Sequence, residues 1–261
     1  MACRTLIFYW ILQVARMAGI LKEAKRGLRR RSGAFLHDAI HNSPSWLKRY
    51  TAPALCYVEM LLVDYGITRT FFSNRHKFAS DAWRSAQPAP HHLRWMAKHG
   101  VKTVINLRGD QSFGTRWLEE QACKRHGLKL VDLTLRSRAA PEREEFRAVR
   151  DVLKSVEFPI LLHCKSGADR AGLMSVLVLH LHHGVPIAEA KKQLSLRFGH
   201  VRHADTGVLD YVFDRYLADN AVSPITFWDW METKYDPAEL NRTFRANGIA
   251  NRLVNGILGR E

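Results

Sequence analysis

The stretch FPILLHCKSGADRAG, residues Phe158–Gly172, decides the fold. Residues 160–162 form a short, continuous apolar run, which is typical of a strand buried on both faces of a sheet. From Arg170 the sequence continues as RAGLMSVLVLHLHHG, which is apolar on every side until His182 and therefore predicts a buried helix. A strand, a short polar loop and the start of a helix are thus expected to meet at Cys164.

The loop between this strand and this helix is suited to binding an anion. The first N–H groups of a helix have no partner within the helix and carry partial positive charge. Five residues separate Cys164 from Arg170, so the loop N–H groups and the guanidinium can surround one tetrahedral phosphate. The same positive field favours the thiolate form of Cys164. We therefore expect a phosphate to be bound by the loop residues Lys165, Ser166, Gly167, Ala168, Asp169 and Arg170.

The pattern His-Cys-x5-Arg, from His163 to Arg170, resembles the phosphate-binding loop of the cysteine-dependent protein tyrosine and dual-specificity phosphatases. Its K-S-G-A-D-R segment is similar to that of bacterial relatives, and the resemblance covers about residues 82–217. It implies a protein-tyrosine-phosphatase-like fold and a thiolate that attacks phosphorus to give a phosphocysteine, which water hydrolyses without a metal or other cofactor. The competing interpretation of Cys164 is an ordinary buried core thiol.

Strands that alternate with helices predict an α/β fold with a central, mostly parallel sheet flanked by helices. Besides residues 160–162, strands are expected at Ala82–Pro88, Val101–Leu107 and Leu128–Leu135. Helices are expected at Pro53–Tyr65, Pro88–Gly100, Trp117–His126, Pro141–Val156, Pro186–Arg197, Thr206–Leu217, Phe227–Tyr235 and Asp236–Asn247. In such folds ligands bind at the carboxyl ends of the strands, where the Cys164 loop is expected.

We divide the chain into three parts. Residues 1–80 are predicted to form a basic, mostly helical N-terminal extension with a basic connector at Arg69–Lys77, residues 81–218 the catalytic domain, and residues 219–261 a helical C-terminal extension. The net charge of the chain is +15, and residues 1–50 hold ten Lys/Arg against two Asp/Glu, or +8 (10 − 2). Such charge favours phosphate-rich partners. No zinc-finger spacing or RNA-binding signature accompanies it, so nucleic acid is not expected.

The N-terminal segment has three interpretations. Its uninterrupted apolar run, Leu6 to Leu12, is shorter than the ~20 residues that span a bilayer. The alternatives are a signal peptide, an amphipathic helix on an anionic membrane, and a helix that packs on the catalytic domain. Four widely spaced cysteines without a C-x-x-C pair indicate a reducing compartment. We therefore predict a cytoplasmic protein, with attachment to the inner face of the membrane as the alternative.

The resemblance assigns Cys164 as the nucleophile and Arg170 as the bidentate clamp on the phosphoryl group. It also implies an acidic residue about thirty positions before the cysteine that protonates the leaving group. Asp132, 32 residues ahead, is the first candidate, although it lies in a predicted strand; Asp169 and Glu142 are the alternatives. For Asp169 a structural role is an equal alternative.

Several other residues near the loop are open to two interpretations. Lys165 is either an electrostatic partner of the phosphate or a solvated side chain, and Arg136 and Arg138 either bind a second anionic group or lie in solvent. Ala171 replaces the Ser or Thr that the family uses to stabilise the departing thiolate, which predicts slow breakdown of the intermediate. No metal site is predicted from the scattered histidines, because no carboxylate or cysteine set accompanies them: His180, His182, His183, His200 and His203.

These observations favour a cysteine-dependent phosphomonoester hydrolase, of the protein tyrosine or dual-specificity type, whose partner is a phosphorylated protein or another phosphomonoester. The alternatives are a phosphoinositide or inositol phosphate phosphatase, a rhodanese-like sulfurtransferase, and a phosphate-binding adaptor without turnover.

Overall fold

The computed structural model of the chain describes residues 27, 31–40, 42, 44–64, 73–109 and 111–245. The chain divides into two compact units, residues 1–67 with 111–118 and residues 68–110 with 119–261. The interpretations of residues 1–26, including the membrane-binding helix, and of the tail 248–261 lie outside the described residues. In the part of the chain that is described, no helix has the length and apolar character needed to cross a bilayer.

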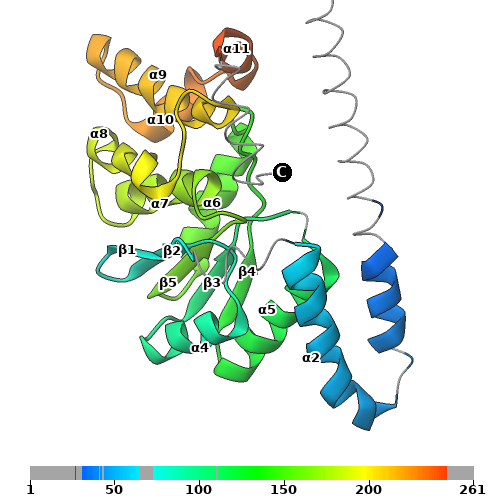
Figure 1. Cartoon of the computed structure of the whole chain (residues 1–261). Helices are drawn as coiled ribbons and strands as arrows, with labels where there is room; N and C mark the ends of the chain where they lie inside the picture. Colours follow the sequence, from blue (N-terminus) through cyan, green and yellow to red (C-terminus); the bar gives the residue numbers. More distant parts are fainter. Residues whose placement is uncertain are drawn as a thin grey trace, which may run out of the picture. The chain divides into compact units, whose positions relative to one another are not determined.

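The second unit is built on a five-stranded sheet (Figure 1). In chain order its strands are β1 (His76–Ala79), β2 (Ala82–Ser85), β3 (Thr103–Asn106), β4 (Lys129–Asp132) and β5 (Ile160–His163). Their spatial order is β1-β2-β5-β3-β4, with β1 antiparallel to β2 and the other three pairings parallel. The predicted α/β fold with a mostly parallel sheet is confirmed.

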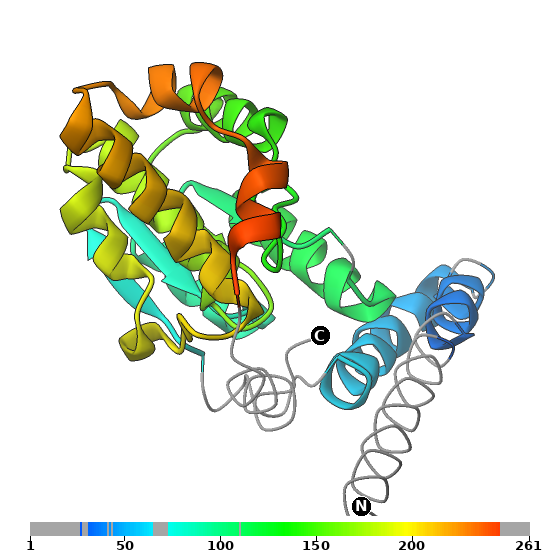
Figure 2. The same cartoon turned by 90° about the horizontal axis from the view of Figure 1, so that it is seen from above.

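Helices cover both faces of the sheet. They are α4 (Pro90–Lys98), α5 (Phe113–His126), α6 (Arg143–Ser155), α7 (Asp169–Leu181), α8 (Ile187–Ala190), α9 (Val208–Val222), α10 (Phe227–Thr233) and α11 (Pro237–Thr243). Figure 1 shows α4 on one side of the sheet and α6 and α7 on the other, and Figure 2 shows the yellow-to-red helices gathered over this second side. Val104 and Leu161 pack in the core with α4, whereas Ile105 and Leu162 pack in the larger core with α6 and α7.

β5 and α7 form the centre of this unit, as the opening stretch predicts. β5 lies between β2 and β3, and each of its four residues is buried. α7 is buried from Ala171 to Val178 without interruption, which explains why its sequence has no polar face. The carboxyl end of β5 therefore opens in the middle of the sheet, with Cys164 directly after it.

Three details differ from the sequence-based expectations. The predicted basic connector ends in β1, where His76 and Lys77 pair with β2, an edge position that tolerates charged residues. The predicted helix Pro186–Arg197 is divided into α8 and the 3-10 turns η1 (Lys191–Gln193) and η2 (Leu196–Phe198). The boundaries predicted at residues 81 and 219 both fall inside the second unit, because β1 joins its sheet and Phe227 and Trp230 are buried in its core.

The first unit joins α2 (Ser45–Leu62) to residues 111–118, which include the start of α5. Oε2 of Glu59 accepts a hydrogen bond from the N–H of Gly114 at 2.9 Å, and the hydroxyl of Thr115 donates to Oδ2 of Asp64 at 3.1 Å. A Cβ at position 114 would lie 2.8 Å from the carbonyl oxygen of Cys56, so only glycine allows this approach.

Candidate active site

A small pocket lies at the carboxyl end of β5, around the loop that leads into α7. The sequence-predicted residues Cys164, Lys165, Ser166, Asp169 and Arg170 line it, and Ser137, Arg138 and Thr206 complete the lining. Cys164 is only 2% exposed. Its Sγ accepts a hydrogen bond from the backbone N–H of Gly167 at 3.2 Å, so the loop curls back over the sulfur.

The peptide groups of this loop have a common direction. Four successive carbonyl oxygens, those of residues 165–168, accept hydrogen bonds from groups outside the loop: Gln87 N–H, Asn74 Nδ2 and, twice, Arg84 Nη2. In a trans peptide the N–H points opposite to the carbonyl of the preceding residue. The N–H groups of residues 166–169 are therefore turned to the inner side of the loop, and the bond from Gly167 N–H to Cys164 agrees with this.

Arg84 on β2 is the main support of the loop. Its side chain is fully buried, and Nη2 donates to the carbonyl oxygens of Gly167 and Ala168 at 2.8 and 2.9 Å. Nη1 donates to the carbonyl oxygen of Gln193 at 2.7 Å. Burial lowers the pKa of Arg84 to about 10, although the neighbouring Cys164 and Asp169 favour its charged form, so at neutral pH a buried cation lies beneath the loop.

Gly167 allows the loop to lie close to β2. Its φ is +74°, and a Cβ there would lie 2.6 Å from the backbone N of Ala86. Any other residue would therefore face both a strained backbone and a clash. On the other side of the loop, Asn74 donates to the carbonyl oxygens of Ser166 and Phe198 at 3.0 and 2.9 Å. The loop is thus fixed from two directions before any ligand binds.

Asp169 is the only carboxylate among the described residues that line the pocket, and the buried His200, which is itself bonded to the buried Asp210, holds it. Its Oδ1 lies 2.7 Å from Nδ1 of His200, and Nε2 of His200 lies 2.5 Å from Oδ2 of Asp210. Burial by itself would lower the pKa of His200, but the hydrogen bonds with the two aspartates outweigh it and raise the pKa to about 9. At neutral pH an imidazolium therefore lies between two carboxylates.

The other two candidates for the general acid lie outside the pocket lining. Asp132 ends β4, and its Oδ1 accepts a hydrogen bond from the amide of Asn106 on β3 at 2.8 Å. Glu142 caps α6, and its Oε1 accepts a hydrogen bond from Nη1 of Arg136 at 2.7 Å. The structure therefore brings only Asp169 of the three to the loop of Cys164.

Some of the cationic side chains near the loop line the pocket and others do not. Arg138, Lys165 and Arg170 line it. Arg136 does not, since its guanidinium lies against Glu142 at 2.7 Å and Glu145 at 2.5 Å. Of the two arginines that the sequence offered for a second anionic group, Arg138 is the one at the pocket.

Three further buried residues complete the site. His163 is fully buried with Nε2 2.7 Å from Oε1 of Glu119, so it faces away from the pocket. Ala171 is fully buried, and the nearby hydroxyl of Ser175 donates to the carbonyl oxygen of Ala171 at 2.7 Å. Thr206 is buried at the pocket, and its hydroxyl makes no hydrogen bond within the described part of the chain, which leaves it available to a ligand oxygen.

Sequence reasoning missed the supporting residues, which are Asn74, Arg84, His200, Thr206 and Asp210. Only Arg84 carries a local signal, because an arginine between Trp83 and Ser85 in a short strand must either reach solvent or be bonded inside. Chemically, the assembled site can hold a tetrahedral anion between N–H groups, a guanidinium and one sulfur atom. The pocket lining contains one thiol and one carboxylate but no histidine, so it offers no metal-binding set.

Comparisons with known proteins show the family of the chain. A family model described as a DSP-PTPase phosphatase fused to NAD+ kinase matches residues 68–203. A rice (Oryza sativa subsp. japonica) protein, the probable NAD kinase 2 of chloroplasts, is 25% identical over 128 residues, which are 48% of this chain and 13% of that protein. The chain thus spans only about an eighth of this relative.

Solved structures with a related arrangement include Pseudomonas aeruginosa TpbA, with 19% identity, a TM-score of 0.45, and coverage of 57% of this chain and 92% of that one. A Cys-to-Ser variant of TpbA in complex with phosphotyrosine has 22% identity, a TM-score of 0.41 and coverage of 55% and 91%. A putative phosphatase from Shewanella putrefaciens has 18% identity, a TM-score of 0.44 and coverage of 56% and 90%.

Proposed function

The chain belongs to the family of dual-specificity-type phosphatases described as fused to NAD+ kinase, and from this premise we propose that it hydrolyses phosphomonoesters with Cys164 as the nucleophile. The observation that best supports the proposal is the direction of the loop's peptide groups. With the carbonyl oxygens of residues 165–168 bonded outward, the N–H groups of residues 166–169 face the inner side of the loop, where the oxygens of a phosphate would lie. Arg170, on the first turn of α7, adds the planar guanidinium that binds two of these oxygens.

The proposed reaction has two steps. In the first, the Cys164 thiolate attacks phosphorus, an S–P bond forms, and the P–O bond to the leaving group breaks. In the second, water attacks phosphorus, the S–P bond breaks, and inorganic phosphate and the thiolate are released. The inward N–H groups and Arg170 stabilise the charge on the equatorial oxygens in both steps.

We assign the proton for the leaving group to Asp169. It is the single carboxylate of the described pocket lining, and its Oδ1 is held by His200. In the free site the His200 imidazolium favours the ionised form of Asp169, whereas a phosphate dianion bound beside the thiolate favours its protonated form, so Asp169 takes up the proton when the substrate binds. Asp169 then returns to the protonated form when it takes a proton from the attacking water. Asp132, the first candidate from the sequence, is replaced in this role because it is bonded to Asn106 outside the pocket lining.

The first test of the proposal is turnover of p-nitrophenyl phosphate. Cys164→Ser is expected to abolish it, and vanadate, which resembles the transferring phosphoryl group, is expected to inhibit the wild-type chain. Cys123→Ala is the matched control, because Cys123 is also a buried free thiol but lies in the core with α4. Turnover that survives in Cys164→Ser contradicts the proposal.

Two other functions give different results in the same assay. A burst of one equivalent of nitrophenol without steady turnover identifies a phosphate-binding protein that stops at the phosphocysteine, which the alanine at position 171 favours. Thiocyanate formed from thiosulfate and cyanide identifies a sulfurtransferase. Vanadate-sensitive multiple turnover without thiocyanate supports phosphate ester hydrolysis.

The substrate we propose is phosphotyrosine in a protein, because an aryl ester has a good leaving group and needs little help from an acid. A phosphoinositide or inositol phosphate is the second candidate, and the position of Arg138 beside Lys165 favours it. A panel of phosphotyrosine peptides and inositol phosphates distinguishes the two. If Arg138 binds a second phosphate, Arg138→Met lowers kcat/KM about 10-fold or more for a bisphosphate but little for a peptide. Arg136→Met is the control, since Glu142 and Glu145 already bind Arg136.

A further inference from the structure

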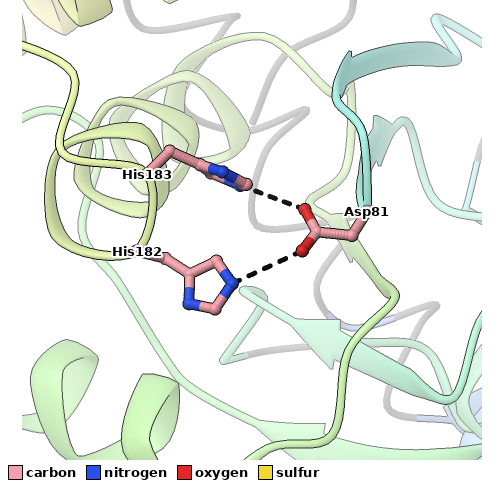
Figure 3. A group of neighbouring side chains, drawn as sticks. All are labelled: Asp81, His182 and His183. Atoms are coloured by element: carbon pink, nitrogen blue, oxygen red, sulfur yellow. Dashed lines mark ion pairs between the residues drawn. The ribbon is translucent and has the colours of Figure 1, made fainter.

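A second cluster of side chains lies at the opposite end of α7 from the pocket. Asp81 is in the turn between β1 and β2, while His182 and His183 directly follow α7 (Figure 3). Nε2 of His183 lies 3.0 Å from Oδ1 of Asp81, and Nε2 of His182 lies 3.4 Å from Oδ2. Each of the three residues offers one possible ligand atom, and these three atoms all lie within 4.8 Å of one another. Among the described residues no other group of His, Cys, Asp or Glu meets this condition.

The contact between Asp81 and His183 is close but is not a hydrogen bond. Oδ1 of Asp81 and Nε2 of His183 are both shielded from solvent, and neither makes a hydrogen bond within the described part of the chain despite their separation of 3.0 Å. Donor atoms around a tetrahedral ion lie roughly 3.3 Å apart, as bond lengths of about 2.0–2.1 Å require. The separation of 3.0 Å between Oδ1 of Asp81 and Nε2 of His183 is close to this value, and Nε2 of His182 lies 3.4 Å from the other carboxylate oxygen.

Ring contacts hold the two histidines, and a backbone hydrogen bond holds Asp81. The ring of His182 stacks on Phe158 with a centroid distance of 3.9 Å and an interplanar angle of 5°. The ring of His183 lies at 90° to that of His182, with the centroids 4.8 Å apart. The carbonyl oxygen of Asp81 accepts a hydrogen bond from the N–H of Ile160 at 2.9 Å, which joins the turn to β5. His180 faces elsewhere, with Nδ1 2.9 Å from the carbonyl oxygen of Val185.

We propose that Asp81, His182 and His183 bind a divalent transition-metal ion, with Zn²⁺ as the best match. Two imidazoles and one carboxylate suit zinc and its first-row neighbours, whereas Mg²⁺ and Ca²⁺ prefer oxygen ligands alone. Three protein ligands leave a coordination position for water. In the sequence no carboxylate accompanies the histidines, because the proposed ligand Asp81 lies about a hundred residues before His182 and His183.

The ion would act on stability and not on the chemistry of the pocket. The cluster follows α7, whereas the pocket surrounds its first turn, and the thirteen residues of α7 extend about 20 Å. Bound there, the ion would connect the β1–β2 turn to the end of the central helix. A ligand that binds only the folded chain raises its stability by mass action. This inference does not depend on the proposed phosphatase reaction.

The test is calorimetric titration of the full, tag-free chain with Zn²⁺. It is made in the Cys164→Ser background, because the thiolate of Cys164 is itself a zinc ligand. We expect one saturable ion per chain. Asp81→Asn and His183→Gln should each lower the Zn²⁺ affinity at least about 100-fold, since each removes a metal ligand. Loss of a residue that only supports a metal ligand already lowers metal affinity about 10–100-fold. His91→Gln is the matched control, because exposed His91 belongs to the other adjacent His pair, which is in no such group.

Thermal unfolding in Zn²⁺ and in EDTA provides the second readout. The Cys164→Ser chain with its three metal ligands intact should have a higher Tm in Zn²⁺ than in EDTA. Asp81→Asn and His183→Gln should each abolish this difference in Tm, while both variants still unfold cooperatively in EDTA. The proposal is overturned if no saturable binding occurs, or if Asp81→Asn and His183→Gln bind Zn²⁺ as tightly as His91→Gln. It is also overturned if each variant lowers Tm equally in Zn²⁺ and EDTA, because the cluster is then only an ion pair.

Discussion

At the scale of single residues, Asp169 is the side chain whose surroundings matter most. It lines the pocket with one oxygen held by His200, and it lies next to Arg170, the proposed ligand of the phosphate. A carboxylate there repels a phosphate dianion unless it carries a proton, and as a proton donor it matters most for poor leaving groups. Its effect on rate should therefore depend on the substrate.

Asp169→Asn is expected to lower kcat for phenyl phosphate about 100-fold or more, and to lower kcat for p-nitrophenyl phosphate much less. The measurement is steady-state turnover of both esters. Asp132→Asn is the matched control and should leave the ratio of the two rates unchanged. If Asp169→Asn slows both esters equally, Asp169 only anchors the loop through His200.

Arg84 is the second residue that carries a prediction, because it satisfies several buried acceptors with one guanidinium. Arg84→Met removes the side-chain donor of the Gly167 carbonyl oxygen, at a cost of about 1–3 kcal/mol, and leaves the carbonyl oxygen of Ala168 with only the N–H of Gly172. We expect a fall in the free energy of unfolding, measured in urea, and at least ~10-fold weaker inhibition by vanadate. Arg84→Lys should rescue little, because one ammonium cannot match the fork. Arg94→Met, an exposed arginine on α4, should change neither quantity.

At the scale of elements, His200 connects α7 to α9 through Asp169 and Asp210. Its pKa is raised from 6.5 to about 9 in the folded chain. Stability from this charge is therefore fully present below about pH 6.5 and is lost as the pH rises through 9. The free energy of unfolding should fall by roughly 3 kcal/mol across this range.

Urea unfolding between pH 6 and pH 10 measures this dependence. His200→Gln removes the titrating group, so the variant should be less stable than the wild type at pH 6. Its free energy of unfolding should lack the fall that the wild type shows as the pH rises through 9. His203→Gln is the control, since His203 is exposed on the same segment. Equal slopes for the wild type and His200→Gln would exclude the buried imidazolium.

The elements themselves were largely predictable because their signals are local. β5 and α7 begin and end within about a residue of the predicted positions, since an unbroken apolar run and the change to polar residues mark them directly. β1 was missed because an exposed edge strand with Lys77 has no apolar alternation. The helix predicted at Pro186–Arg197 breaks after η1, at Leu194, whose ψ of 81° is not helical.

The site was predictable only where its residues are neighbours in sequence. Cys164 to Arg170 form one motif, whereas Arg84 lies 83 residues from the Gly167 carbonyl that it binds, and His200 lies 31 residues from Asp169. Such contacts depend on strand order and helix packing, which no local pattern encodes. Spacing along the chain likewise does not say which strand end faces the loop, so the sequence alone could not choose between Asp132 and Asp169 as the acid.

At the scale of the whole molecule, the C-terminal helices support both the core and the pocket. Phe227, Trp230 and Tyr235 are fully buried in the core that contains Cys164. The hydroxyl of Tyr235 donates to the carbonyl oxygen of Pro141 at 2.6 Å, and Oδ1 of Asn241 accepts from the N–H of Ala140 at 2.7 Å. These bonds fix the end of the segment that carries Arg138 to the pocket.

A chain that ends at Ala218, the predicted end of the catalytic domain, should therefore fail to fold cooperatively, whereas a chain that ends at Arg245 should unfold like the full chain. Because truncation of one buried tryptophan already costs about 3–5 kcal/mol, Trp230→Ala in the full chain should produce much of the same loss. Thermal and urea unfolding measure both. If the chain ending at Ala218 unfolds cooperatively with the Tm of the full chain, residues 219–261 are an extension, as the sequence suggested, and the shared core does not govern stability.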